Sequence, residues 1–315
     1  MKAIGGYFEL ELKRAKSYHR NAIPLNLARN CLEYILRVRK YKRIYIPYFT
    51  CEVLLEPLRR VDIDVEFYSI NKFFDPIKEY RLEENEAFLY TNYWGLKSST
   101  IMNLKNVYGR RLIVDNSQAF YAQPVEGIDT FYSARKFFGV PDGAYLYIDE
   151  TLKMDIGCDI SINRMSHLLK RIDLGVEQGY EDFKNNEEFI DQPILKMSLL
   201  TETLMKSIDY KYIANVRKRN FEYLSSKLGS KNEYSFTIGT NEIPMVYPFL
   251  SKEGESLKEM LISKHVFVAT YWPNVLEWCN PKSMEFFLTK NVLALPIDQR
   301  LEISDLDRII NILNL

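Results

Sequence analysis

An acid, an amide, a hydroxyl and a lysine follow one another within residues 111–149, RLIVDNSQAFYAQPVEGIDTFYSARKFFGVPDGAYLYID. Asp115 ends an apolar strand and Gln118 follows it, and Ser133 and Lys136 precede a glycine turn and a second apolar strand. A carboxylate, a phosphate-binding hydroxyl and a lysine are what a protein needs to hold pyridoxal 5′-phosphate as an imine. The stretch predicts imine chemistry at Lys136; the alternative is that these residues are ordinary parts of an α/β sheet.

Asp115 and Gln118 are the candidate partners of the cofactor ring. The pyridine nitrogen must stay protonated to act as an electron sink, which requires a carboxylate beside it, and Asp115 is placed for that role. Gln118 is the candidate partner of the phenolate oxygen. Each also has a common structural explanation, an acid that caps the turn after a strand and a loop residue that faces water.

Lys136 is the candidate Schiff-base residue. Only the neutral amine forms an imine, so its pKa should be depressed. Its neighbours Phe131, Phe137 and Phe138 are apolar. We expect burial and the adjacent Arg135 both to lower the pKa of Lys136. The alternative is an ordinary surface lysine.

Three residues are candidates for binding the phosphate group. Ser133 lies three residues before Lys136, and Arg29 and Asn30 lie where a helix is predicted to begin. A helix N-terminus binds phosphate through its free N–H groups and its dipole. For Arg29 the alternative is a solvated charge in the first turn of that helix.

Predicted elements alternate between strand and helix through the first half of the chain. Apolar spacing predicts a helix over 25–40, with Asn26 as its cap, and strands at 43–46, 61–70, 87–95 and 112–115. This alternation predicts an α/β fold with a largely parallel sheet, whose ligands collect at the carboxyl ends of the strands. Three such ends, at 47–51, 93–95 and 115–118, are expected to converge on one site.

The later part of the chain changes in composition. Residues 151–228 are predicted to be mostly helical, and the stretches after Gly229, including HVFVATYWP, are strand-like with helices between them. We predict two domains, a large cofactor-binding domain at 1–225 that includes the N-terminal segment, and a small α+β domain at 226–315.

Composition narrows the possible partners. The chain has 315 residues, is 47% hydrophobic and carries 42 Lys+Arg against 42 Asp+Glu, a balance that does not favour nucleic acid or an anionic membrane. Four scattered cysteines without a CxxC pair and three scattered histidines argue against a metal site. We expect a cytoplasmic protein, because the N-terminus does not resemble a signal peptide and no apolar run approaches ~20 residues.

Taken together, these segments resemble the DegT/DnrJ/EryC1/StrS family of sugar aminotransferases over nearly the whole chain. IVDNSQAF resembles the family's Asp-x-x-Gln motif, and FYSARKFFGVPDGAYLYID resembles its lysine segment. LNLARNCLEYIL is similar to the first helix with its phosphate-binding start. RIYIPYFTCEVLLEPL resembles the segment that covers the cofactor ring; Cys51 stands at the covering position, and Tyr48 or Tyr93 could take its place. Ser198 could replace an asparagine that the partner subunit usually supplies.

The resemblance implies a fold and a reaction. The fold is the pyridoxal-phosphate-dependent transferase fold type I, a three-layer αβα large domain with a mostly parallel mixed sheet plus a small C-terminal domain. The protein would be a homodimer with active sites at the subunit interface. It would transfer an amino group from glutamate to a keto sugar nucleotide, for a surface polysaccharide or related glycan, with Lys136 as Schiff-base residue and proton shuttle.

A second hypothesis is that the protein has this fold but does not catalyse a reaction. Leu27 and Ala28 stand where the family usually has glycine and serine, and Cys51 stands where an aromatic residue is common. These departures suggest a catalytically inactive protein that binds cofactor or nucleotide sugar in a structural or regulatory role. A generic Rossmann-like binding module is disfavoured, because no GxGxxG follows an early strand.

Overall fold

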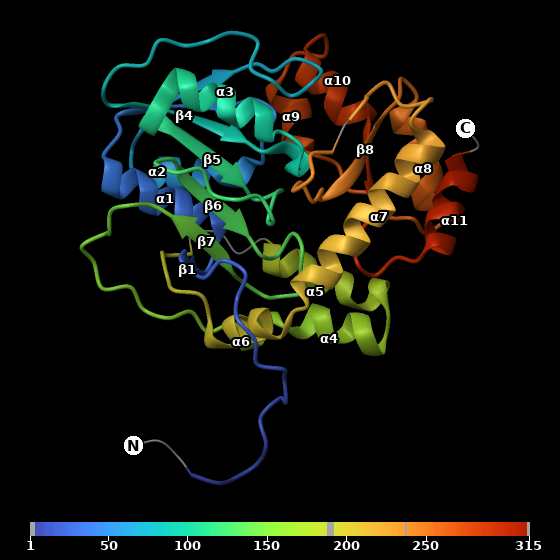
Figure 1. Cartoon of the computed structure of the whole chain (residues 1–315), viewed down its shortest axis with the longest axis horizontal. Coiled ribbons are helices and arrows are strands. Elements are labelled where there is room, and N and C mark those ends of the chain that lie inside the picture. Colours follow the sequence, from blue (N-terminus) through green and yellow to red (C-terminus); the bar gives the residue numbers. More distant parts are fainter. Residues whose placement is uncertain (1–3, 188–191, 237, 314–315) are drawn as a thin grey trace.

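A mixed sheet forms the centre of the first half of the chain (Figure 1). The structure is a computed structural model, and it describes residues 4–187, 192–236 and 238–313. Within them the strand order is β1-β7-β6-β5-β4-β2-β3; the pairs from β3 to β6 are parallel, and β7 and β1 are antiparallel to their neighbours. The strands are β1 Ile23–Leu25, β2 Arg43–Pro47, β3 Asp64–Tyr68, β4 Glu86–Thr91, β5 Leu112–Asn116, β6 Asp129–Ser133 and β7 Ala144–Tyr147.

Helices cover both faces of this sheet, as predicted from the alternation of elements. Successive strand residues point to opposite faces, so each strand contributes to two apolar layers. One layer joins Ile113 and Phe131 to Leu32 and Ile35 of α1, and the other joins Val114 to α3. The helices of this part are α1 Ala28–Arg39, α2 Leu55–Arg60, α3 Ser98–Tyr108, α4 Ser166–Asp173, α5 Val176–Glu187 and α6 Leu199–Ser207.

A long helix, α7 Tyr210–Leu228, leads into a second, smaller sheet (Figure 1). Strands β8 Val246–Leu250 and β9 Val292–Pro296 pair antiparallel and pack with α7, α8 and α11 around a separate apolar core. The domain boundary predicted at 225/226 lies inside α7 and stays a prediction. The remaining helices are α8 Gly254–Ser263, α9 Pro273–Trp278, α10 Met284–Asn291 and α11 Ile303–Leu313.

The strand predicted in HVFVATYWP does not form. Residues 266–270 have no regular secondary structure, and α9 begins directly after Trp272. Val266 and Val268 pack into the C-terminal core, whereas Trp272 packs against the core of the large sheet. The apolar residues of this segment are therefore explained by burial against two different cores and not by hydrogen bonding to a neighbouring strand.

No helix among the described residues is long and apolar enough to cross a bilayer.

Candidate active site

The carboxyl ends of two neighbouring parallel strands carry Asp115 and Ser133. Asp115 pairs in register with Phe131, two residues before Ser133. Because side chains alternate along a strand, Asp115 shares its face with Ile113, and Ser133 shares its face with Phe131. Ile113 and Phe131 both pack against α1. The two polar side chains therefore lie on the α1 side of the sheet, where α1 begins.

A cavity of about 130 Å3 lies at these strand ends. It collects six of the eight residues predicted to bind the cofactor. Those six are Arg29, Cys51, Asp115, Gln118, Ser133 and Lys136. Residues from the ends of β2, β4, β5 and β6 and from the start of α1 contribute to its wall.

Asp115 is a buried carboxyl group whose oxygen Oδ1 accepts a hydrogen bond from the Ser117 backbone N–H at 2.8 Å. Burial raises the pKa of Asp115, and the Ser117 hydrogen bonds and the charge of Lys136 counter only part of this effect. A cationic group placed beside Asp115 would favour its ionised form. A protonated pyridine nitrogen is such a group, so this carboxyl fits the predicted cofactor.

Gln118 has one satisfied and one unsatisfied polar end. Its Oε1 accepts a hydrogen bond from the Trp94 backbone N–H at 2.9 Å. Its Nε2 is buried and has no hydrogen-bond partner among the described residues. A buried donor without a partner lowers the stability of the fold by about 1–3 kcal/mol. A ligand oxygen that accepts a hydrogen bond from this donor would remove that penalty. The phenolate oxygen of pyridoxal phosphate is of the right kind.

Lys136 lies in the turn that connects β6 to β7. The backbone N–H groups of Phe137 and Phe138 both donate to the Ala134 carbonyl, at 3.1 and 3.0 Å. These bonds fold the chain tightly after Ser133 and leave Lys136 in the wall of the cavity. Part of the Lys136 residue is exposed to solvent.

The expected depression of the Lys136 pKa is not found. Burial lowers the pKa of Lys136, but interactions with Tyr271, Cys51, Glu187 and Asp115 together outweigh burial, and the pKa lies above its ordinary value. The Arg135 guanidinium forms an ion pair with Glu187. The sequence showed the apolar and cationic neighbours of Lys136 but not the Glu187 and Tyr271 side chains that other segments bring to it.

The start of α1 forms another side of the cavity. Leu27, Ala28 and Arg29 line it, and no side chain caps the helix at Leu27. The guanidinium of Arg29 contacts the Glu56 carboxylate at 3.0 Å, and burial lowers the pKa of Arg29. Ser133 faces the same cavity. Helix N–H groups, a hydroxyl and a guanidinium are together suited to a phosphate group.

Two predicted cofactor ligands do not reach the cavity. The Asn30 side chain, in the first turn of α1, is buried; it donates to Asn26 Oδ1 at 2.9 Å and accepts from Arg60 at 2.9 Å. Tyr93 is fully buried, and its hydroxyl donates to the Phe49 carbonyl at 2.9 Å. Both side chains satisfy backbone and side-chain partners inside the fold, so we correct their assignment to structural roles.

Two further suggested residues do not line the cavity. Ser198 is the N-cap of α6, where its hydroxyl accepts from the Thr201 N–H and donates to Asp142. Tyr48 does not line the cavity, and its ring stacks on Phe67 with centroids 4.8 Å apart.

Other lining residues escaped the sequence analysis. Thr91 ends β4, and Glu187 ends α5, where no motif marks it. Trp272 lies in the aromatic segment ATYWPN, whose composition was its only signal. Gly143 lies beside the cavity with a φ of +114°, a conformation that favours glycine.

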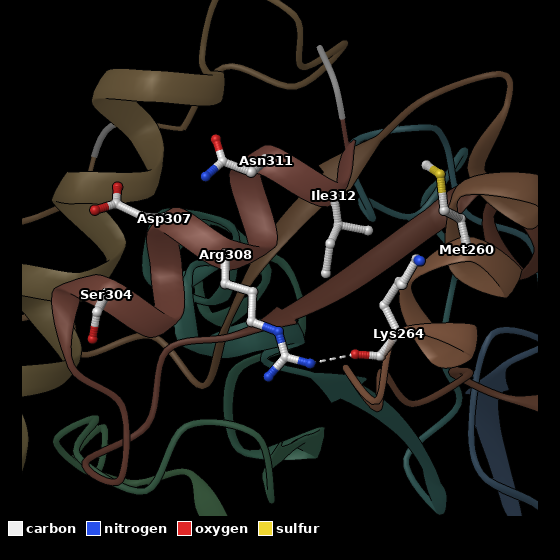
Figure 2. Close-up of a pocket in the computed structure, with 7 residues that line it drawn as sticks. All are labelled: Met260, Lys264, Ser304, Asp307, Arg308, Asn311 and Ile312. Atoms are coloured by element: carbon white, nitrogen blue, oxygen red, sulfur yellow. Dashed lines mark hydrogen bonds between the residues drawn. The ribbon is translucent and has the colours of Figure 1, made fainter.

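A second hollow lies on the C-terminal region between α8 and α11 (Figure 2). It contains no residue of the predicted cofactor site, and its one carboxylate, Asp307, already accepts a hydrogen bond from the Tyr223 hydroxyl. In Figure 2 the guanidinium of Arg308 reaches the Lys264 carbonyl. Of these two cavities, the one at the strand ends is therefore the candidate active site.

No protein-family model matches the sequence, and no curated protein matches it either. Solved structures do match it. DesV of S. venezuelae, in complex with a ketimine intermediate, has a TM-score of 0.64 at 14% identity, over 92% of this chain and 83% of DesV. A DegT DnrJ EryC1 StrS aminotransferase from Brucella abortus has a TM-score of 0.63 at 15% identity, over 93% of this chain and 85% of that protein.

The PLP-form of the sugar aminotransferase Spr1654 from Streptococcus pneumoniae has a TM-score of 0.61 at 14% identity, over 93% of this chain and 86% of that protein. The chain thus has the predicted fold type I architecture, and it is similar in structure to sugar aminotransferases of the DegT/DnrJ/EryC1/StrS type.

Proposed function

We propose that this protein is a pyridoxal-phosphate-dependent aminotransferase of the cytoplasm that transfers an amino group from glutamate to a keto sugar nucleotide, for surface polysaccharide or related glycan synthesis. One observation carries the proposal: the buried Asp115 carboxyl, Lys136, and Gln118, whose Nε2 has no partner in the described part of the chain, line one cavity. The structural likeness to sugar aminotransferases supports the choice of acceptor.

When bound, the cofactor supplies an electron sink for carbanion chemistry. The chain's own residues have separate tasks. The Asp115 carboxylate keeps the pyridine nitrogen protonated, and Gln118 Nε2 donates to the phenolate oxygen. Ser133, Arg29 and the N–H groups at the start of α1 bind the phosphate. Lys136 Nζ would hold the cofactor, and as a free amine it would carry the proton that amino transfer requires.

The groups that raise the pKa of Lys136 bear on this role. Tyr271, Cys51, Glu187 and Asp115 raise it, so the protonated amine is favoured in the protein without its cofactor. The amine would have to release that proton before it could attack the cofactor's carbonyl carbon. We infer that the Glu187 carboxylate, which lines the same cavity, would favour a cationic nitrogen at this place.

We also propose that the protein is a homodimer. Residues 160–174 expose large apolar side chains, among them Leu169, Ile172 and Leu174 at 55%, 80% and 60% exposure. None of the residues of α4 is buried. Exposed apolar side chains of this size are typical of surfaces that a partner covers, and a second copy of the chain is the partner expected for this fold.

The experiment combines one variant with one matched control. Purified protein is mixed with pyridoxal phosphate, reduced with borohydride and digested, and the modified lysine is identified by mass spectrometry. We expect modification at Lys136 and its loss in Lys136→Ala, whereas Lys153→Ala, at an exposed position, behaves as wild type. In a separate, unreduced sample with pyridoxal phosphate, glutamate should yield 2-oxoglutarate, at a rate lower by at least about 100-fold in Lys136→Ala.

The outcomes separate the hypotheses. No modification of Lys136 would overturn the proposal. Modification at Lys136 without any 2-oxoglutarate would favour the alternative, a catalytically inactive protein that binds the cofactor.

A further inference from the structure

One wall of the cavity comes from far along the chain. Of the described residues that line it, Trp272 alone lies beyond residue 187. Its side chain is 8% exposed, so the indole lies almost wholly within the protein. The other lining residues belong to the large sheet and the segments that follow its strands, and they include Cys51, Asp115 and Lys136. The C-terminal region thus supplies an aromatic ring to a site that the first half of the chain builds.

Two contacts fix Trp272 beside the Cys51 segment. Asn274 Nδ2 donates to the Thr50 carbonyl at 3.0 Å, in a buried position. The Trp272 ring also packs edge-on against Phe49, with centroids 5.4 Å apart at 64°. Both Thr50 and Cys51 line the cavity. The indole is therefore held in the cavity wall beside Cys51, whose side chain is small.

The neighbouring residue, Tyr271, lies close to the lysine. The Lys136 Nζ lies 5.8 Å from the centroid of the Tyr271 ring. On its other side Tyr271 packs edge-on against Trp94, at 4.8 Å and 86°. The Trp94 backbone N–H in turn donates to Gln118 Oε1. Tyr271 and Trp272 together connect the candidate Schiff-base lysine, the candidate phenolate partner and the Cys51 segment.

We propose that Trp272 is the aromatic residue that contacts the face of the cofactor ring, supplied by the C-terminal region in place of a ring at Cys51. This inference rests on the proposed function, because it takes the cavity to be the cofactor site. The cofactor is a planar heteroaromatic ring, and aromatic pairs gain about 0.5–1.5 kcal/mol beyond the area they bury. Loss of that contact corresponds to roughly a 2- to 13-fold weaker affinity.

The test compares two replacements of different chemistry. Trp272→Phe keeps an aromatic ring, and Trp272→Leu keeps apolar bulk without one. Trp278→Phe is the control, since Trp278 packs against Phe67 at 5.6 Å and does not line the cavity. For each variant the affinity for pyridoxal phosphate is measured by equilibrium dialysis, and the circular dichroism of the bound cofactor is recorded in the visible range.

We expect Trp272→Leu to bind pyridoxal phosphate up to about 10-fold more weakly and to lose most of the visible circular dichroism. Trp272→Phe should restore both, and Trp278→Phe should match wild type. Wild-type affinity and dichroism in Trp272→Leu would overturn the inference. Equal losses in the Leu and Phe variants would overturn it as well, because the aromatic contact would not be their cause.

Failure of this inference can be told from failure of the proposed function. If wild type takes up the cofactor on Lys136 and the Leu variant binds it equally well, only the role of Trp272 is wrong. If wild type does not take up the cofactor at all, the proposed function fails, and the inference fails with it.

Discussion

Asp115 combines two demands that oppose each other. Burial raises its pKa, so the ionised carboxylate is disfavoured in the folded protein as it stands. A bound cation would reverse that balance, because an opposite charge at close range favours the ionised form. The residue is therefore better suited to the protein with its ligand than to the protein without it. Gln118 shows the same feature, since its buried Nε2 lacks a partner within the fold.

Asp115→Asn should affect stability and cofactor binding in opposite directions. A raised folded-state pKa means that its contribution to stability is complete below the unfolded pKa of about 3.9 and is lost as pH rises through the folded pKa. At pH 7 the cofactor-free variant should therefore melt at a higher temperature than wild type, with no gain at low pH. Its affinity for pyridoxal phosphate should fall about 10- to 100-fold, because a charged hydrogen bond is lost.

Thermal melts at pH 7 and pH 4 and a binding titration check both parts. Asp155→Asn, at an exposed position, is the control for the loss of one negative charge. A lower melting temperature at pH 7 would contradict the argument from burial, and unchanged affinity would remove Asp115 from the cofactor site.

At the scale of elements, the turn between β6 and β7 determines where Lys136 lies. Gln299, which follows β9, donates from Nε2 to the Phe137 carbonyl at 3.0 Å. The guanidinium of Arg217, in α7, lies 4.6 Å from the centroid of the Phe137 ring. The C-terminal region thus contacts the residue next to the lysine from two elements. A shift of α7 or of the segment after β9 relative to the sheet would therefore change the position of Lys136.

Gly143, at the end of this turn, is the position where we expect the turn to be least tolerant of change. Its φ is +114°, and an added Cβ would lie 3.0 Å from the Thr201 side chain and 3.3 Å from Ala134. Its N–H donates to the Asn26 carbonyl at 2.6 Å, which ties the turn to the start of α1. Gly143→Ala should cost about 1–3 kcal/mol of unfolding free energy and reduce the amount of cofactor bound.

Urea unfolding and the bound-cofactor stoichiometry measure these two effects. Gly139→Ala is the matched control, because it lies in the same turn without a positive φ, and the nearest atom to its added Cβ is 3.6 Å away. Equal stability of the two variants would contradict the prediction, because it would show that an alanine side chain fits at Gly143.

At the scale of the whole molecule, His19 joins the N-terminal segment to the seven-stranded sheet. The imidazole is buried; its Nε2 lies 2.8 Å from the Phe120 carbonyl and its Nδ1 lies 3.1 Å from the Tyr147 hydroxyl. Tyr18 packs edge-on against Tyr121, with ring centroids 5.2 Å apart. These contacts join a segment outside the sheet to β7 and to the loop after β5, which carries Gln118 and follows Asp115 at the end of the strand.

His19 should give the protein an acid-sensitive stability. Burial lowers the pKa of His19 to about 4. Because the folded pKa is depressed, its contribution is complete above the unfolded pKa of about 6.5 and is lost as pH falls toward 4. The loss is on the order of 3 kcal/mol by pH 4.

Urea unfolding at several pH values between 7 and 4 measures this loss. His19→Gln should be less stable than wild type at pH 7 but show a shallower decline. The exposed His265, replaced by Asn, should keep the wild-type slope. Identical slopes in wild type and His19→Gln would contradict the argument.

Sequence reasoning anticipated most of the large sheet and the centre of the site. The strands at 43–46 and 112–115 form within one residue of the prediction. Asp115, Gln118, Ser133 and Lys136 meet as expected. The reason is local: alternation along a strand sets the face on which a side chain lies, and the ends of neighbouring parallel strands share one edge of the sheet.

Only the tertiary structure decided how the remaining polar groups are used. Asn30 and Tyr93 lie near the predicted places, yet their hydrogen-bonding groups are taken up by Asn26, Arg60 and Phe49. The sequence by itself determined which residues could serve the chemistry, because type and spacing are local properties. Packing decided that Trp272 completes the cavity and that Glu187 and Tyr271 lie near Lys136, because contacts between segments far apart in the sequence leave no periodic trace in the chain.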